Sequence, residues 1–140
     1  DALHAVTKNA IALQPVYWIA RRLRAKYFIQ KEQWEKAQFE LKLFTQRSFA
    51  DDDPNAAWKG WSLYQYGIVL MKLKQFEEAQ QAFDESLKVQ QGSEDISRAE
   101  RLMYRGLARQ MAGSSGYISD WKEAADLGHN EAESLLEEHA

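Results

Sequence analysis

The sequence predicts an all-α domain built from antiparallel helix hairpins, and three observations lead to this prediction. Residues 33–38 (QWEKAQ) return 42 positions later as residues 75–80 (QFEEAQ), each time at the start of an amphipathic segment. The 140-residue chain has only two prolines and seven glycines, and 45% of its residues are hydrophobic. Apolar residues recur at three- and four-residue steps, as in helices with one buried face. Self-similarity at this spacing indicates a repeat architecture.

Residues 1–15 are expected to form the second helix of an incomplete repeat, or an N-terminal cap. Their apolar side chains make an arc broader than a helix covered on one side needs, and it consists of Leu3, Val6, Ala10, Ile11 and Leu13. We expect this helix to close at Pro15, since proline interrupts helices. The chain is therefore expected to be part of a longer array.

Residues 18–50 are predicted to be the first complete repeat, with Ala25 in its first helix and Ala37 twelve residues later in its second. The 42-residue spacing then leaves about eight residues more than a 34-residue repeat. These extra residues lie near the Asp51-Asp52-Asp53-Pro54 run.

In that run, Asp53 is predicted to cap a helix that has Pro54 at its first position. Asp51 and Asp52 would complement the positive end of the helix dipole. Capping is favoured over cation binding because the other spaced oxygen ligands of a calcium loop are missing.

Residues 60–92 are predicted to be the second repeat. The apolar face of its first helix consists of Leu63, Tyr66, Leu70 and Leu73. Gly67 lies in the middle of this face, where glycine costs roughly 1 kcal/mol relative to alanine. We expect a close approach of the next helix at this glycine, near Ala79, which follows twelve residues later.

Residues 95–128 are predicted to be a divergent third repeat, in which Gly106 takes the glycine position. Its turn at residues 112–116 is looser, and its second helix is expected to end at Gly128 as a C-cap. Residues 130–140 are predicted to be a capping helix whose outer side carries glutamates.

These spacings resemble the tetratricopeptide repeat (TPR), whose pattern is W-x₂-L-G-x₂-Y, then A-x₃-F, then P. The second copy supplies Leu63-x₂-Tyr66-Gly67-x₂-Leu70 and Ala79-x₃-Phe83, and Gln91 stands where proline is often found. Residues 124–132 are similar to the ends of bacterial repeat proteins of this type. The resemblance implies an α-solenoid, in which hairpins stack into a right-handed superhelix around a concave groove.

Side chains that could do chemistry are not grouped in the sequence. The histidines (His4, His129 and His139) lie far apart, and none forms a metal-spaced pair. The chain has no cysteine, which excludes disulfides, thiolate zinc sites and a cysteine nucleophile. We expect no enzymatic activity, no cofactor and no metal.

The charge of the chain is unevenly distributed. Residues 1–50 carry nine Lys and Arg against four Asp and Glu, and residues 51–140 carry nine against seventeen, for net charges of +5 and −8. The basic segment consists of Arg21, Arg22, Arg24 and Lys26, with aromatic neighbours. Nucleic acid could bind there, but the sequence pI of about 5.7 argues against a dedicated nucleic-acid binder.

By the same resemblance, the first helices of the hairpins line the groove and bind the partner. The groove residues implied are Arg22, Lys26, Trp61, Tyr64, Gln65, Lys72, Met103 and Tyr104. Aromatic, Met and Arg side chains are the types enriched in binding hot spots. The alternative for Trp61 and Tyr64 is that they pack under a neighbouring helix.

The leading hypothesis is a non-catalytic scaffold or adaptor that binds a protein or peptide with acidic and apolar residues. The alternative is a structural segment that self-associates within a larger assembly, and the third is nucleic-acid binding through residues 21–26. Apolar runs such as residues 68–71 are far short of the ~20 residues of a membrane span. The lack of cysteine favours the cytoplasm and leaves the periplasm open.

Overall fold

The computed structural model of the chain describes residues 14–89 and 96–139. The described part is all-α, with seven α-helices, one 3₁₀-helix and no strand. The elements are α2 (Gln14–Gln30), α3 (Trp34–Gln46), η1 (Pro54–Trp58), α4 (Lys59–Lys72), α5 (Phe76–Lys88), α6 (Arg98–Ala112), α7 (Tyr117–Asp126) and α8 (Asn130–Glu138). The predicted all-α class is confirmed.

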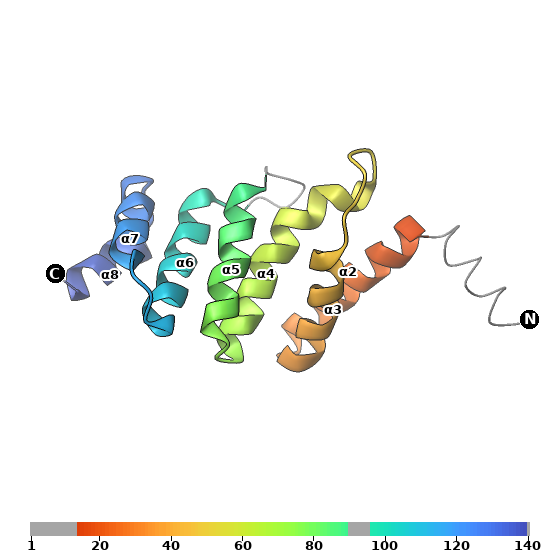
Figure 1. Ribbon diagram of the computed structural model, residues 1–140, viewed down its shortest axis with the longest axis horizontal. Coiled ribbons are helices and arrows are strands. Elements are labelled where there is room, and N and C mark those ends of the chain that lie inside the picture. Colours follow the sequence, from red (N-terminus) through yellow and green to blue (C-terminus); the bar gives the residue numbers. More distant parts are fainter. Residues whose placement is uncertain (1–13, 90–95, 140) are drawn as a thin grey trace, which may run out of the picture.

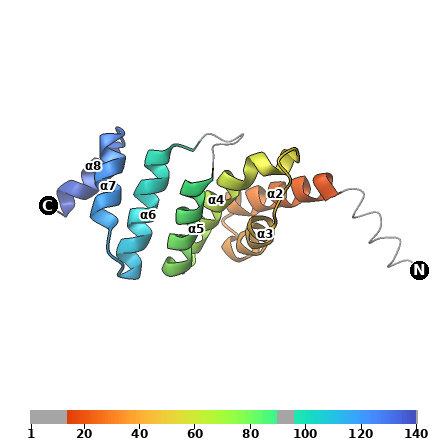
Figure 2. The same ribbon diagram turned by 45° about the horizontal axis from the view of Figure 1, so that its top comes forward.

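The helices form a row in which each one packs mainly on the helices before and after it (Figures 1 and 2). Short turns join α2 to α3, α4 to α5, and α6 to α7, so the row contains three hairpins, followed by α8. Pro15 lies in the first turn of α2, so a helix continues from it to Gln30. The helix expected at residues 1–13 lies outside the described residues.

Close approach at glycine sets the register within the second and third hairpins. A Cβ atom built on Gly67 would lie 2.6 Å from two ring carbons of Phe83, and one built on Gly106 would lie 2.3 Å from the indole nitrogen of Trp121. The predicted close approach at Gly67 is confirmed, and the residue that meets it is Phe83. The same contact in two hairpins shows that Phe83 and Trp121 are equivalent.

The core is a series of apolar layers along the row. The first layer joins the first hairpin to α4 and contains Ala25, Ala37, Leu41, Trp61 and Val69. The second lies between α4, α5 and α6, and the third between α6, α7 and α8. Each hairpin therefore packs both within itself and against its neighbours in the row, as in repeat architectures.

The turns of the first two hairpins have the same backbone shape. Glu32 and Lys74, which are 42 residues apart, both have positive φ angles, of 56° and 62°. Farther along, Gly128 has a φ of 92°, and the N–H of the following His129 donates to the carbonyl of Ala124 at 3.1 Å. This arrangement closes a helix C-terminus: α7 ends at a glycine as predicted, although Leu127 is the C-cap and Gly128 is the left-handed residue after it.

The inserted segment is tied to both neighbouring hairpins. The carboxylate of Asp53 accepts a hydrogen bond from the N–H of Asn55 at 2.8 Å, which confirms the predicted cap, although the helix that it starts is the 3₁₀-helix η1. The buried Asn55 side chain donates to the carbonyl of Pro15 at 3.1 Å. The ammonium of Lys59 donates to the carbonyls of Thr45 and Arg47 at the end of α3.

Candidate functional site

Four of the predicted groove residues are buried in the row of helices. Trp61, Tyr64 and Met103 belong to the apolar layers, and Arg22 is covered as well. Tyr64 makes edge contacts with the rings of Phe83 and Tyr104, at centroid distances of 6.0 and 5.9 Å. The expectation that these side chains are accessible is wrong, because Trp61, Tyr64 and Met103 pack in the three apolar layers and Arg22 packs on Trp58.

The other four predicted groove residues are more accessible but dispersed. Lys26 and Lys72 are exposed, and Gln65 and Tyr104 are half-buried. The ammonium of Lys72 lies 5.8 Å from the centre of the Trp34 ring. Tyr104 stacks on Phe83 at 5.9 Å, with the two rings tilted by 20°. These contacts hold the side chains to the fold, and the eight predicted residues do not form one open surface.

The basic segment at residues 21–26 is largely used within the first hairpin. Arg21 lies 2.7 Å from the buried carboxylate of Glu40, and Arg24 lies 3.6 Å from it. Burial opposes the charge of Arg21, but its hydrogen bonds to Tyr17 and Glu40 raise its pKa above the usual value. The guanidinium of Arg22 stacks on Trp58 at 3.7 Å.

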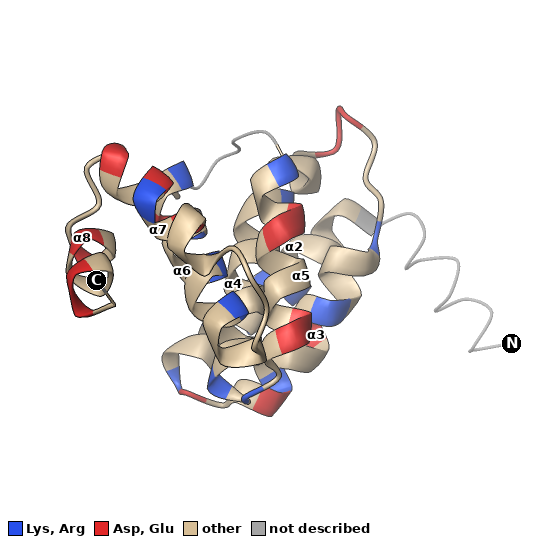
Figure 3. Cartoon of the chain, turned by 60° about the vertical axis from the view of Figure 1, so that its left-hand side comes forward, with Lys and Arg blue, Asp and Glu red and all other residues tan. Residues whose placement is uncertain are grey.

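Lys26 and Arg24 are the exposed cations of that segment, and Arg24 lies within reach of Glu40. Figure 3 shows Lys and Arg distributed over several helices with acidic residues among them. The four cations therefore do not act as a single phosphate-binding strip, which weakens the case for nucleic-acid binding.

The most accessible apolar surface lies on the first hairpin. Of the seven large hydrophobic side chains that are exposed in the described residues, five belong to α2 and α3. Val16, Leu23 and Tyr27 are 62%, 51% and 53% exposed, and the four- and three-residue steps among them place them with Ala20 on one side of α2. We call Val16, Ala20, Leu23 and Tyr27 the α2 face.

Two of these four positions, those of Ala20 and Tyr27, are buried in both of the other hairpins. The 42-residue spacing pairs the α2 face with Trp58 at the end of η1 and with Ser62, Gln65 and Val69 of α4. Val69, which corresponds to Tyr27, is fully buried against the first hairpin. In α6 the matching residue is Ala108, which is fully buried in the layer that contains α5. Within the described residues, only the α2 face lacks a covering helix.

A recess of about 410 Å³ adjoins the α2 face between α2 and α3. It is lined by Arg24, Phe28, Glu35, Lys36, Phe39 and Glu40. Phe39, which lines this recess, is 61% exposed. The recess therefore combines aromatic walls with both signs of charge.

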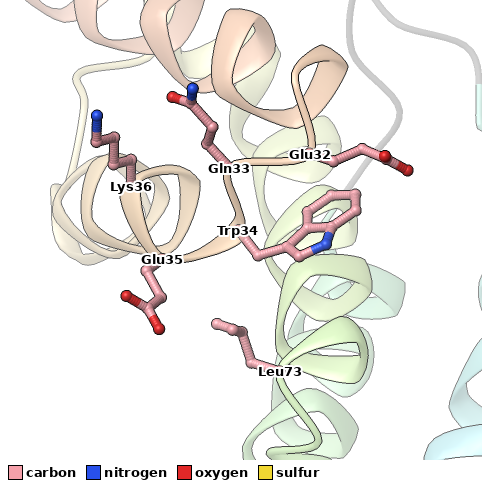
Figure 4. Close-up of a pocket in the computed structure, with 6 residues that line it drawn as sticks. All are labelled: Glu32, Gln33, Trp34, Glu35, Lys36 and Leu73. Carbon is pink, nitrogen blue, oxygen red and sulfur yellow. The ribbon is translucent and has the colours of Figure 1, made fainter.

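A second recess, of about 330 Å³, lies where the turn of the first hairpin meets the end of α4. Figure 4 shows Trp34 projecting from the start of α3 towards α4, with Leu73 below it. Glu35 and Lys36 line both recesses, so the two openings are neighbours. Together with the α2 face they form an apolar and charged surface at one end of the row.

Comparison with protein-family models, curated proteins and solved structures finds no significant match for this chain. In the part of the chain that the structure describes, no helix is long and apolar enough to cross a membrane. The same residues contain no group of three or more His, Asp or Glu side chains that could hold a metal ion.

The sequence-based selection of site residues missed the α2 face. The signal was available, since the 42-residue spacing aligns Leu23 and Tyr27 with Gln65 and Val69. These positions pack between neighbouring repeats. Bulky residues there in the first described repeat indicate a surface that another helix or protein covers.

Proposed function

We propose that this chain is a non-catalytic protein-interaction module made of three TPR-like repeats in a right-handed superhelix. We place its binding surface on the α2 face and the adjoining recess, instead of the concave groove. Contiguous exposed apolar side chains rimmed by charges are typical of protein-interaction sites. The glycine contacts in two hairpins and the matched turns at Glu32 and Lys74 support the repeat assignment.

The observation that carries the proposal is the exposure of Tyr27 at a position that is fully buried in α4 and α6, next to the exposed Leu23, whose counterparts are half-buried. Burying each large apolar side chain against a partner would contribute roughly 1.5–3 kcal/mol at most to the free energy of binding. A partner that covers three such side chains gains enough to offset part of the entropy lost on association.

The buried carboxylates of Glu40 and Asp120 join helices through arginines, which supports a structural role for them. Asp120 binds Arg105 and Arg109, and Glu40 binds Arg21.

The test combines Leu23→Glu with Tyr27→Glu and measures capture of proteins from the organism that produces the chain. The matched control combines Gln46→Glu with Gln81→Glu, which adds the same charge at exposed positions of α3 and α5. We expect the α2 variant to lose capture, the control to retain it, and both to unfold at the wild-type urea midpoint. Equal capture by the two variants would contradict the proposal.

Self-association is a second candidate, which the opposed charges of the two ends favour. Residues 1–50 carry a net charge of +5, and α8 carries four glutamates and no Lys or Arg (Figure 3). Sedimentation velocity over a range of concentrations tests this. A strict monomer at the highest concentration removes the second candidate.

A further inference from the structure

We propose that the partner on the α2 face is an α-helix of another protein, and that this helix carries a carboxylate that pairs with Arg24. The inference rests on the proposed function, because it assumes that a protein binds there. Its basis is an ion-pair arrangement in the third hairpin that the first hairpin reproduces only in part.

In the third hairpin, Arg105 joins three helices. Its guanidinium lies 2.8 Å from Asp120 of α7, the second helix of its own hairpin. It also lies 2.7 Å from Asp84 of α5, the helix that precedes α6 in the row. Hydrogen bonding to Asp120 is the main cause that raises the pKa of Arg105. The arginine thus has one carboxylate from its own hairpin and one from the helix that covers it.

Arg24 stands at the same position in the first hairpin. Arg105 directly precedes Gly106, the close-contact residue of α6, and Arg24 directly precedes Ala25, the residue 42 positions before Gly67. Both arginines therefore project from the same side of the first helix of a hairpin.

The carboxylates of the second helices are equivalent too. Asp120 directly precedes Trp121, which meets the glycine of its hairpin, and Glu40 directly precedes Leu41, which lies 42 positions before Phe83. Arg24 reaches Glu40 as Arg105 reaches Asp120, although at the longer distance of 3.6 Å.

Among the described residues, no carboxylate pairs with Arg24 in the way that Asp84 pairs with Arg105. The Arg24 side chain is 62% exposed, whereas the Arg105 side chain, paired on both sides, is 16% exposed. A partner that covers the α2 face as α5 covers α6 would bring a carboxylate to Arg24 in the position of Asp84. The recess of about 410 Å³ beside Arg24 gives that side chain room.

The cover is a helix because the equivalent faces of α4 and α6 are covered by α3 and α5. On α5, the apolar Phe83 and the acidic Asp84 are adjacent, so a single turn supplies both contacts. Tyr27 stands where α4 and α6 have Val69 and Ala108. The partner helix therefore needs a small residue, such as alanine, opposite Tyr27.

Within these 140 residues, neither residues 1–13 nor α8 is a good source of this helix. Asp1 is the only acidic residue among residues 1–13, so that segment offers Arg24 almost no carboxylate. The acidic helix α8 directs Leu135 and Leu136 towards its own core layer, which leaves polar residues on its outer side. A helix of another protein satisfies the apolar and the charged requirement together.

The probe for the test is a stapled helical peptide of about 14 residues, a length at which an unstapled helix is marginal in water. One face carries alanine and leucine with one aspartate beside them, and two sister peptides replace that aspartate by asparagine or lysine. Binding to the full 140-residue chain is followed by fluorescence anisotropy and by NMR signals of the α2 face.

We expect the aspartate peptide to bind tightest and to shift the signals of Leu23 and Tyr27. Arg24→Glu should weaken its binding about tenfold and make the lysine peptide the preferred ligand. The control Lys122→Glu, on the exposed side of α7, should leave all three affinities unchanged.

Equal binding of the three peptides, or no shift at Leu23 and Tyr27, would overturn the inference. So would NMR contacts that show residues 1–13 of the same molecule, or a second copy, on the α2 face. The proposed function is tested separately, since protein capture that depends on Leu23 and Tyr27 can persist when no helical peptide binds.

Discussion

The carboxylate of Asp120 lies in the interior of the row and receives two hydrogen bonds from Arg105, at 2.8 and 3.1 Å. A third comes from Arg109 at 2.9 Å. Its side chain is only 4% exposed. Three charge-assisted hydrogen bonds to one buried carboxylate fix the angle between α6 and α7, because each bond tolerates little displacement.

Asp120→Asn is expected to destabilise the protein by about 3–5 kcal/mol, since it leaves two part-buried arginines without their shared anion. Urea unfolding measures the change. The control Glu123→Gln breaks the exposed pair with Arg98, at 3.2 Å, and should cost less than about 1 kcal/mol. Equal costs for the two substitutions would show that Asp120 is not the stabilising anion.

Gly67→Ala is expected to destabilise the protein by about 1–3 kcal/mol, although alanine is the better helix former by roughly 1 kcal/mol. The added methyl group would lie 2.6 Å from the Phe83 ring, so α4 and α5 must separate. Urea unfolding of the variant tests this. A gain in stability would mean that the ring moves aside without cost.

Asp53→Ala is expected to cost about 1 kcal/mol, because it removes the cap of η1. The carboxylate also holds the side chain of Asn55 at 2.9 Å, and that side chain bonds to Pro15 in α2. The matched control is Asp52→Ala, at an exposed position one residue earlier. Thermal unfolding of the two variants should differ, and identical midpoints would rule out a capping role for Asp53.

Stability is expected to fall as the pH rises above 10.0, the usual pKa of tyrosine. Burial, followed by the negative charge of Glu100, raises the pKa of Tyr64 in the folded protein. The folded state therefore keeps Tyr64 protonated while the unfolded chain ionises, and the stabilisation that is complete below pH 10.0 is lost above it.

The measurement compares wild type with Tyr64→Phe by urea unfolding from about pH 9 to about pH 11.5. Phenylalanine cannot ionise, so the decline should be shallower in the variant, by up to about 1.4 kcal/mol per pH unit. Parallel declines would show that Tyr64 ionises as easily in the folded state as in the unfolded chain.

The parts of the fold that depend on short sequence spacings could be predicted. The step from Gly67 to the second helix and the recurrence of QWEKAQ as QFEEAQ identify the helices of the second hairpin. Asp53-Pro54 identified the start of the inserted helix. Such local signals work because glycine, proline and aspartate each restrict the backbone or its hydrogen bonds in a known way.

The binding surface could not be predicted in the same way, because exposure depends on which helices are neighbours. Helical phase places Tyr64 on one side of α4 but does not show that α6 covers that side, where Tyr104 meets it at 5.9 Å. Leu23 and Tyr27 are of residue types that are common in protein cores. They are exposed because α2 lies at the end of the described row.

The most direct test of protein binding at the α2 face is site-specific photo-cross-linking in the cells that produce this protein. A photoreactive phenylalanine analogue replaces Leu23 in one variant and the exposed Gln81 of α5 in the other. We predict that the probe at position 23 links to another protein and that the probe at position 81 does not. Links from position 23 only to the same chain, or none at all, would contradict the assignment of this face as the binding surface.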